Sequence, residues 1–342
     1  MTRQGHTRFV DELRRFAAGH ADPSVTAVAE RCAAPLRVAV RGRPGVGLRT
    51  VARALALAGL AVTTGGCDVV VHVVAEVVKP EDAEAVAAAG RPVTAVLNKA
   101  DLAGSLSGRT GDAPLAAARA RCAEFAALIG APMEPMSALL AVAADDLEAA
   151  LWAALRALAA DPGGAACLDG SFAGFLAADI PVPPDVRQRL LDTLDLFGTA
   201  LGIAAARRGG TPAQVRALLH RVSGVDAVVH RISAAGAEAR YRRVLRAVAE
   251  LEALAVGDEG IHRFLCRDDT VLARMAAAVD VAAAAGLDPG AESAAHLPRA
   301  VRWQRYGRGP VSELHRACGG DIARGSLRLW SRDVGPLPGE SN

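Results

Sequence analysis

Two different patterns of apolar residues divide the chain near its middle. In the first half, short continuous apolar runs alternate with stretches in which apolar residues recur every three or four positions. The short runs are typical of strands buried on both faces, and the spaced stretches are typical of helices. This alternation predicts an α/β fold with an open, mainly parallel sheet and helices on both faces. The predicted strands lie within 35–42, 60–64, 67–74, 91–101 and 131–140, and the predicted helices lie near 50–59, 81–89, 114–129 and 145–159.

Beyond a glycine-rich link at 159–174, strand signals nearly vanish. Helical patterns separated by glycines follow, which predicts an all-helical bundle of long antiparallel helices. These patterns cover 184–208, 211–223, 225–256 and 258–286.

We therefore expect four parts in the chain. Helical spacing near the start predicts a leader packed on the sheet domain, and abundant Pro, Gly and Arg near the end predict irregular structure. The expected parts are a helical leader (1–34), the α/β domain (35–160), the helical bundle (161–286) and a basic, largely irregular tail (287–342).

Composition narrows the classes of partner and site. The 342 residues carry a formal net charge of +2, which is too small to indicate nucleic acid as a main partner. The six cysteines are scattered without C-x-x-C, so we expect buried thiols and no metal site. No stretch approaches the roughly 20 apolar residues that span a bilayer, and no apolar signal core begins the chain. These features predict a cytoplasmic protein.

The segment "RGRPGVGLRT" at 41–50 carries the first candidate chemistry. Gly42 and Gly47 have the spacing of a P-loop, G-x-x-x-x-G-K-[ST], between a predicted strand and a predicted helix. In that context, backbone N–H groups and the helix dipole bind phosphate. Leu48 and Arg49, however, stand where a P-loop has Lys and Ser or Thr.

Two further short motifs follow apolar strands. "NKAD" at 98–101 ends one predicted strand, and "SAL" at 137–139 follows the next. Since the carboxyl ends of parallel strands meet at one edge of the sheet, we expect both motifs to lie beside the glycine-rich loop.

Together these motifs resemble the guanine-nucleotide-binding proteins of the TRAFAC class of P-loop GTPases, whose base motif is N-K-x-D. The resemblance implies that Asp101 accepts two N–H bonds from guanine, which adenine cannot supply. It also implies that the Lys99 stem lies along the base and that Asn98 ties the loops together. The implied nucleotide-binding residues are Gly42, Gly45, Gly47, Arg49 and Thr50 for the phosphates, and Asn98, Lys99, Asp101, Ser137 and Ala138 for the base.

The departures from the GTPase pattern predict weakened chemistry. Losing one charge-assisted phosphate contact, as at Leu48, costs about 1.5–3 kcal/mol. The short segment 58–66 leaves no room for a full switch loop and contains no D-x-x-G. We therefore expect no catalytic residue, no bound magnesium and no rapid hydrolysis, and only weak binding of GTP or GDP.

The G domain followed by helices also resembles actinobacterial dynamin-like GTPases. The resemblance implies a pseudo-GTPase with a binding or regulatory role, which pairs with an intact dynamin-like GTPase or with itself. One alternative is a slow, membrane-associated GTPase in which Arg49 or a partner supplies the missing cation.

A second alternative rests on the tail. Residues 298–332 carry eight arginines interleaved with Trp303, Tyr306 and Trp330. Such a segment either binds an anionic membrane surface or nucleic acid, or packs its aromatic rings back onto the protein. The first reading makes the chain a helical scaffold and places it at the inner face of the membrane. His72, His220 and His230 are predicted to be structural.

Overall fold

The computed structural model describes residues 5–103, 114–164, 171–290 and 296–334. The chain folds into two compact units. The sheet unit spans 37–232, and the helical unit combines 1–36 with 233–342. The first and last segments of the chain therefore belong to the same unit.

Valine-rich runs form the centre of a five-stranded sheet in which every strand pair is parallel. The strand order is β2-β1-β3-β4-β5, and β3 is buried along nearly its whole length. Burial on both faces explains the continuous apolar run of β3. The predicted parallel sheet is confirmed. Its strands are β1 (Arg37–Gly42), β2 (Ala61–Val62), β3 (Val69–Ala75), β4 (Val93–Asn98) and β5 (Met133–Met136).

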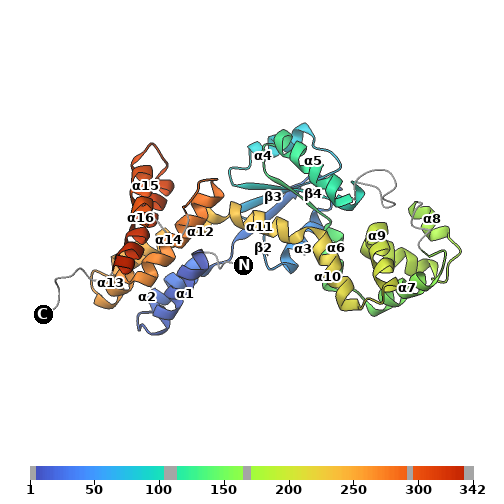
Figure 1. Cartoon of the computed structure of the whole chain (residues 1–342), viewed down its shortest axis with the longest axis horizontal. Helices are drawn as coiled ribbons and strands as arrows, with labels where there is room; N and C mark the ends of the chain where they lie inside the picture. Colours follow the sequence, from blue (N-terminus) through green and yellow to red (C-terminus); the bar gives the residue numbers. More distant parts are fainter. Residues whose placement is uncertain (1–4, 104–113, 165–170, 291–295, 335–342) are drawn as a thin grey trace. The chain divides into compact units, whose positions relative to one another are not determined.

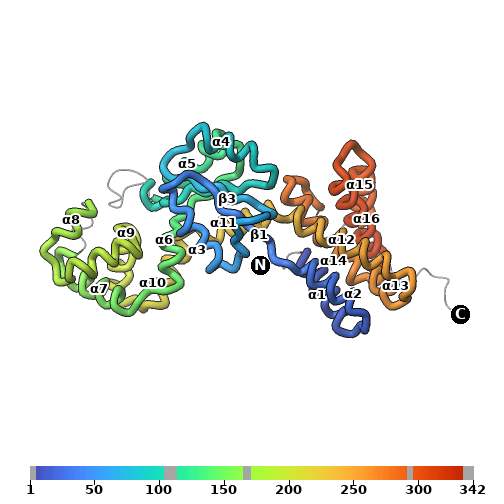
Figure 2. The backbone as a smooth tube through the Cα atoms, turned by 180° about the vertical axis from the view of Figure 1, so that it is seen from behind, coloured from blue at the N-terminus to red at the C-terminus, as the bar shows by residue number. Residues whose placement is uncertain are grey.

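Helices cover both faces of this sheet (Figure 1). α4 and α5 lie on one face and α3 and α6 on the other, and the view from behind in Figure 2 shows the same two layers. The 3-10 helix η1 follows β4 directly. The bounds are α3 (Leu48–Leu57), α4 (Pro80–Ala87), η1 (Ala100–Leu102), α5 (Pro114–Ile129) and α6 (Ala138–Asp145).

The sheet unit continues into a layer of helices that shares a core with α6. Gly198 and Gly202 of α9 let this helix approach closely: a Cβ on Gly198 would lie 2.5 Å from Leu140 Cδ2, and one on Gly202 would lie 2.7 Å from Leu155 Cδ1. The helices of this layer are α7 (Ala149–Ala160), α8 (Phe172–Ala177), α9 (Pro184–Arg207) and α10 (Pro212–Ser223). α11 (Val225–Ala235) follows and contains the boundary of the unit at residue 232.

The predicted helical bundle at 161–286 is therefore wrong as a single domain. Its described part before residue 233 packs in the sheet unit, and the rest packs in the helical unit. The physical reason is that two separate apolar cores attract its helices. One core is built on Leu140 and Leu155, and the other on Phe9 and Tyr241.

The helical unit consists of seven helices among the residues described here. Fully buried Phe9, Leu13 and Tyr241 contribute to its core, so the predicted separate leader at 1–34 is also wrong. The helices are α1 (Gly5–Ala18), α2 (Pro23–Ala33), α12 (Ala237–Leu254), α13 (Glu259–Cys266), α14 (Asp268–Ala284), α15 (His296–Arg308) and α16 (Glu313–Val334).

Two helices, α15 and α16, make up the described tail after residue 295 except for the short connection at 309–312, so the prediction of a largely irregular tail is wrong there. Trp303 and Ile322 are buried in the core of the helical unit. Gly307 and Gly319 bring α15 and α16 together, since a Cβ on Gly319 would lie 2.8 Å from Trp303 O. Glycine thus serves close helix packing here rather than a loop. Residues 291–295 and 335–342 lie outside the described part.

The cysteines and the helix lengths bear on what the composition predicted about thiols and membrane spans. Cys32, Cys67, Cys122 and Cys318 are buried free thiols, whereas Cys266 is exposed; Cys167 lies outside the described residues. In the described part of the chain, no helix combines the length and the apolar character that crossing a membrane requires.

Candidate functional site

The glycine-rich loop joins β1 to α3 in a backbone shape that its glycines make accessible. Gly42, Gly45 and Gly47 have φ angles of 151°, 87° and 88°, which side chains rarely adopt. A Cβ on Gly42 would also lie 2.4 Å from Val73 O on the neighbouring strand. Gly47 is the N-cap of α3 and supplies no side-chain cap. The strand, loop and helix context that the P-loop spacing requires is therefore present.

The residues after Gly47 give this loop an apolar lining. Leu48 Cδ2 lies 3.2 Å from where a Cβ on Gly42 would be, so this side chain leans back over the start of the loop. Arg49 is exposed and Thr50 half-buried. The position that holds lysine in a P-loop thus contributes a hydrocarbon side chain and no charge.

An internal carboxylate holds the second residue of the loop. The fully buried side chain of Asp82 accepts from Arg43 Nε at 3.0 Å and from Lys79 N at 3.0 Å, and it lies 3.1 Å from His72 Nε2. Arg43 also donates to Val77 O at 3.1 Å. The guanidinium of Arg43 is therefore held by hydrogen bonds to the segment after β3. We call Arg43, His72 and Asp82 the loop clamp.

The loop clamp shifts the titration of its carboxylate. Burial by itself raises the pKa of Asp82, but hydrogen bonds from Lys79 N, His72 and Arg43 outweigh burial and leave the pKa below its usual value. His72 fits its predicted structural role because its ring pairs with Asp82 inside the protein. The motifs and apolar patterns of the sequence did not predict the clamp. Its available signal was the N-terminal turn of α4, where Asp82 accepts from the N-cap backbone.

Asn98 connects three of the predicted site segments. Its Nδ2 donates to Val46 O in the glycine-rich loop at 2.8 Å, and its Oδ1 accepts from Ala138 N at 3.1 Å. The Asn98 side chain leaves so little room that a Cβ on Gly47 would lie 2.5 Å from its Nδ2. The structure thus brings together Gly47, Asn98 and Ala138, which the sequence placed on one sheet edge.

Lys99 and Asp101 follow Asn98 in an unusual backbone conformation. Lys99 has a left-handed φ of 58° and an exposed side chain. Asp101 is only 7 % exposed, and none of the described residues donates a hydrogen bond to its carboxylate. A nearly buried carboxylate without a donor can accept N–H bonds from a ligand.

The turn at 137–138 is more constrained than the sequence suggests. Ser137 N donates to Ser223 O at 2.8 Å, and Ala138 N is already bonded to Asn98. Both residues are buried. These two N–H groups therefore stabilise the protein itself, and any base donor from this turn would have to be a later N–H at the start of α6.

A kink in α9 adds a residue that the sequence did not reveal. Asp195 has a φ of 58° and a ψ of −178° inside α9, and its Oδ1 accepts from Leu196 N at 2.6 Å. Burial raises the pKa of Asp195, Leu196 N–H opposes the rise, and the charge of Asp101 adds to it. Asp195 therefore lies within electrostatic reach of Asp101. No local pattern marks this position, since helical spacing continues through it.

The candidate residues differ in how well they fit the base, the phosphates and the magnesium of a bound nucleotide. Asp101 and Lys99 fit a guanine base, whereas Leu48 offers no charge to a phosphate. The hydroxyl of Thr63, a residue of the segment 58–66, accepts from Gly65 N at 3.1 Å. Within the described ranges, no three His, Cys, Asp or Glu side chains gather as metal ligands. The residues therefore fit the base better than they fit magnesium and the phosphates.

No family model, curated protein or solved structure matches this chain. The strand order 2-1-3-4-5 is shared by several doubly wound folds, which bind ligands at the switch point beside β1 and β3. The glycine-rich loop follows β1 at this point.

Proposed function

We propose that this chain is a degenerate, GTPase-like binding or regulatory protein that keeps the base side of a guanine nucleotide site and has lost its phosphate side. The observation that supports this most is the pair of hydrogen bonds made by Asn98 to Val46 O and from Ala138 N. They join the glycine-rich loop, the "NKAD" turn and the "SAL" turn.

Asp101 is the residue that would select the base. Its nearly buried carboxylate would accept two N–H bonds from guanine, while adenine would leave the carboxylate unpaired. The Lys99 stem would lie along the ring, since its side chain is exposed beside Asp101. Selectivity for guanine over adenine is therefore the expected signature.

The phosphate side supports binding without rapid hydrolysis. Backbone N–H groups at the start of α3 and the dipole of this helix can attract an anion, but Leu48 provides no charge. Arg43 is held in the loop clamp. Hydrolysis needs groups that stabilise the charge on the transferred phosphoryl and orient water. We propose that the chain works by docking to an intact dynamin-like GTPase or to a second copy of itself.

A titration with a fluorescent GDP analogue tests this proposal. We expect weak binding that is independent of magnesium, that GDP displaces and that ATP does not. Asp101→Asn should abolish the preference for guanine, and Glu124→Gln, on the exposed side of α5, should not. Absence of binding at high micromolar protein, or equal displacement by ATP, would overturn the proposal. GTP turnover that Asp101→Asn abolishes would instead support the slow GTPase.

A membrane-binding scaffold is a second candidate because part of α15 remains basic and apolar on its surface. Arg305 and Arg308 are exposed and pair with no acid in the described residues, and Leu297 and Val301 are 41 % and 39 % exposed. Most other tail arginines are already bonded within the protein. These are Arg299 to Ser326, Arg302 to Asp288, Arg324 to Asp321, and Arg328 and Arg332 to Asp268.

Vesicle sedimentation separates this candidate from the first. Binding to phosphatidylserine vesicles should weaken steeply with salt and fall in Arg305→Gln/Arg308→Gln. Removing the whole tail is a poorer test, because Trp303 and Ile322 belong to the core. Equal sedimentation of the parent protein with neutral and anionic vesicles would exclude the scaffold.

A further inference from the structure

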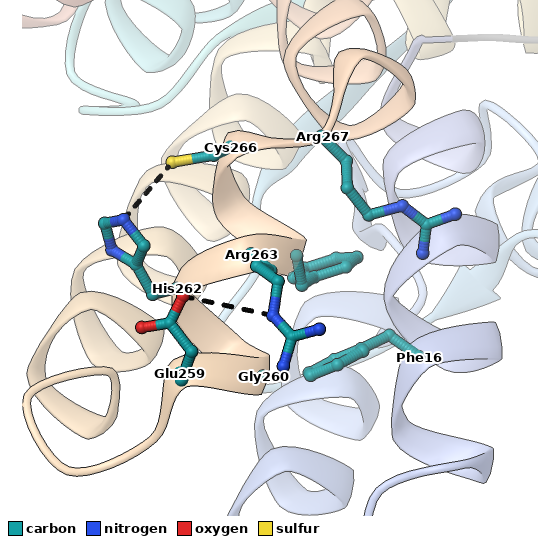
Figure 3. A pocket seen from close by; sticks show the side chains of 8 residues that line it. Phe16, Glu259, Gly260, His262, Arg263, Cys266 and Arg267 are labelled. Carbon is teal, nitrogen blue, oxygen red and sulfur yellow. Dashed lines mark hydrogen bonds and ion pairs between the residues drawn. The ribbon is translucent and has the colours of Figure 1, made fainter.

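We propose that Cys266 is a modification site that forms a mixed disulfide with a small, carboxylate-bearing disulfide. The site is a surface hollow of about 710 Å³ in the helical unit, lined by residues of α1 and α13 and by Arg267 (Figure 3). This volume lies within the range of small-molecule sites. The inference is independent of the nucleotide site, which belongs to the sheet unit.

Cys266 is the accessible thiol among the five cysteines that the structure describes. Burial raises the pKa of Cys32, Cys122 and Cys318 to about 12, so these thiols stay protonated and enclosed. Cys67 is also buried. Cys266 is exposed at the end of α13. Reaction with a solute should therefore be selective for Cys266 within this set.

A base lies next to this thiol. His262 is one helical turn earlier on α13, and its Nε2 is 3.8 Å from Cys266 Sγ. Figure 3 shows the two side chains facing each other on one side of the helix. A neutral imidazole at this distance can accept the thiol proton as the sulfur attacks, which is the arrangement that activates nucleophilic cysteines.

Two arginines give the hollow an attraction for anions. Arg267 pairs with no carboxylate in the described part of the chain, and Arg263 lies 3.9 Å from Glu259 with both side chains 74 % exposed. An ion pair this long and exposed is weak. Figure 3 shows both arginine side chains extending toward α1. A carboxylate-bearing molecule in the hollow would therefore meet more positive than negative charge.

Two stacked aromatic rings form the apolar part of the lining of the hollow. Phe16 of α1 stacks on Phe264 of α13 with ring centroids 4.4 Å apart and an interplanar angle of 10°. Phe264 is 1 % exposed and anchors this stack in the core. A ligand would thus contact hydrocarbon below and guanidinium groups at the side, which suits a small peptide disulfide such as oxidised glutathione.

The reaction is a thiol–disulfide exchange. The Cys266 sulfur attacks one sulfur of the small disulfide while His262 takes the thiol proton. A new S–S bond forms, the original S–S bond breaks, and the leaving thiolate receives the proton. The small disulfide is the only oxidant required, because it is reduced to one thiol as Cys266 is oxidised.

Intact-mass and peptide mass spectrometry with oxidised glutathione test the proposal. The full chain carrying Cys167→Ser provides the parent protein, because Cys167 lies outside the described residues. We expect one glutathionyl adduct, on Cys266, that is absent in Cys266→Ser. Its rate should exceed that of a short unstructured cysteine peptide. Arg263→Gln/Arg267→Gln should slow it about five- to tenfold, as expected for losing attraction to two nearby charges.

The neutral probe 2-hydroxyethyl disulfide provides the matched comparison. Its rate should not change in the double arginine variant, whereas His262→Gln should slow both probes at neutral pH. At alkaline pH, hydroxide replaces the imidazole as base, so this second effect should disappear. A rate no higher than that of the peptide, or equal slowing of both probes by the arginine substitutions, would overturn the proposal.

Discussion

Under the proposed function, the sheet edge has a base side at Asn98 to Asp101 and a phosphate side at the glycine-rich loop, and the two sides differ in the groups that they leave accessible. On the base side, Asn98 bonds two loops, and Asp101 keeps a nearly buried carboxylate without a donor in the described residues. On the phosphate side, Leu48 is apolar and Arg43 is bound to Asp82. Both sides retain their backbone shape. Contacts within the protein, from Asp82 to Arg43 and from Asn98 to Val46 O, hold the glycine-rich loop, so its geometry does not depend on a phosphate-binding side chain.

Asp82→Ala should destabilise the protein more than any other substitution considered below. This change leaves His72 and the Arg43 guanidinium without their buried partner, so we expect it to lower the free energy of unfolding by about 3–5 kcal/mol. Urea unfolding measures this. Glu81→Ala, on the exposed face of the same turn, should cost no more than about 1 kcal/mol. A cost for Asp82→Ala as small as that for Glu81→Ala would show that the clamp does not hold the loop.

The clamp also predicts a pH dependence. Hydrogen bonds lower the pKa of Asp82 in the folded chain below its value in the unfolded chain. Its contribution to stability is therefore complete above the unfolded pKa and is lost as pH falls through the folded pKa. The stability gap between the parent and Asp82→Ala should shrink across this acid range and should be flat near neutral pH.

Leu48→Lys places a positive charge at the position that holds lysine in a P-loop. One regained charge-assisted contact of about 1.5–3 kcal/mol should raise affinity for the GDP analogue roughly ten- to hundredfold. Leu48→Met keeps the apolar volume and should bind as the parent does. Magnesium should still add nothing, because Arg49 occupies the position of the metal-binding hydroxyl. An unchanged affinity in Leu48→Lys would mean that the loop no longer presents a phosphate site.

Two glycine substitutions distinguish backbone strain from contact with Asn98. Gly45 and Gly47 have φ angles of 87° and 88°, but only a Cβ on Gly47 would meet Asn98 Nδ2. Gly45→Ala should cost about 1–2 kcal/mol from strain alone. Gly47→Ala should cost about 1–3 kcal/mol more, because it disturbs a buried hydrogen bond. Equal costs in thermal or urea unfolding would show that Asn98 does not couple the two sides.

The smallest expected effect concerns Asp195. Its φ of 58° and ψ of −178° suit glycine, and its charge is close to that of Asp101. Asp195→Gly should therefore stabilise the protein by about 1 kcal/mol at neutral pH. Asp192→Gly, at a regular position of the same helix, should destabilise it by about 0.3 kcal/mol. The same sign for both variants would contradict a strained kink.

The local pattern of apolar residues was sufficient to predict most strands and helices of the sheet unit. The apolar run at 67–74 predicted β3 (Val69–Ala75), and the run at 91–101 contained β4 (Val93–Asn98). Helical spacing at 114–129 matched α5 (Pro114–Ile129). Parallel strands place their carboxyl ends together, so the motif order also placed the three loops on one edge.

The same pattern did not predict helix ends and ion pairs that depend on packing between distant segments. Gly236 divides the predicted helix at 225–256 into α11 and α12, and a Cβ there would lie 2.5 Å from Leu36 Cδ2. That approach depends on a residue two hundred positions earlier in the chain. Likewise, the arginines of the tail looked unpaired in sequence, but Asp268 binds both Arg328 and Arg332 in the structure.

Local sequence patterns were enough to predict the parallel sheet, the glycine-rich loop before α3 and the order of the candidate motifs. These depend on apolar periodicity and on glycine conformations, which are properties of short segments. Three features were fixed only by packing in three dimensions: the core shared by the first and last segments, the ion pair of Arg43 with Asp82, and the stacking of Phe16 on Phe264. Each depends on which side chains approach across distant segments or helix junctions, and local spacing does not encode such approaches.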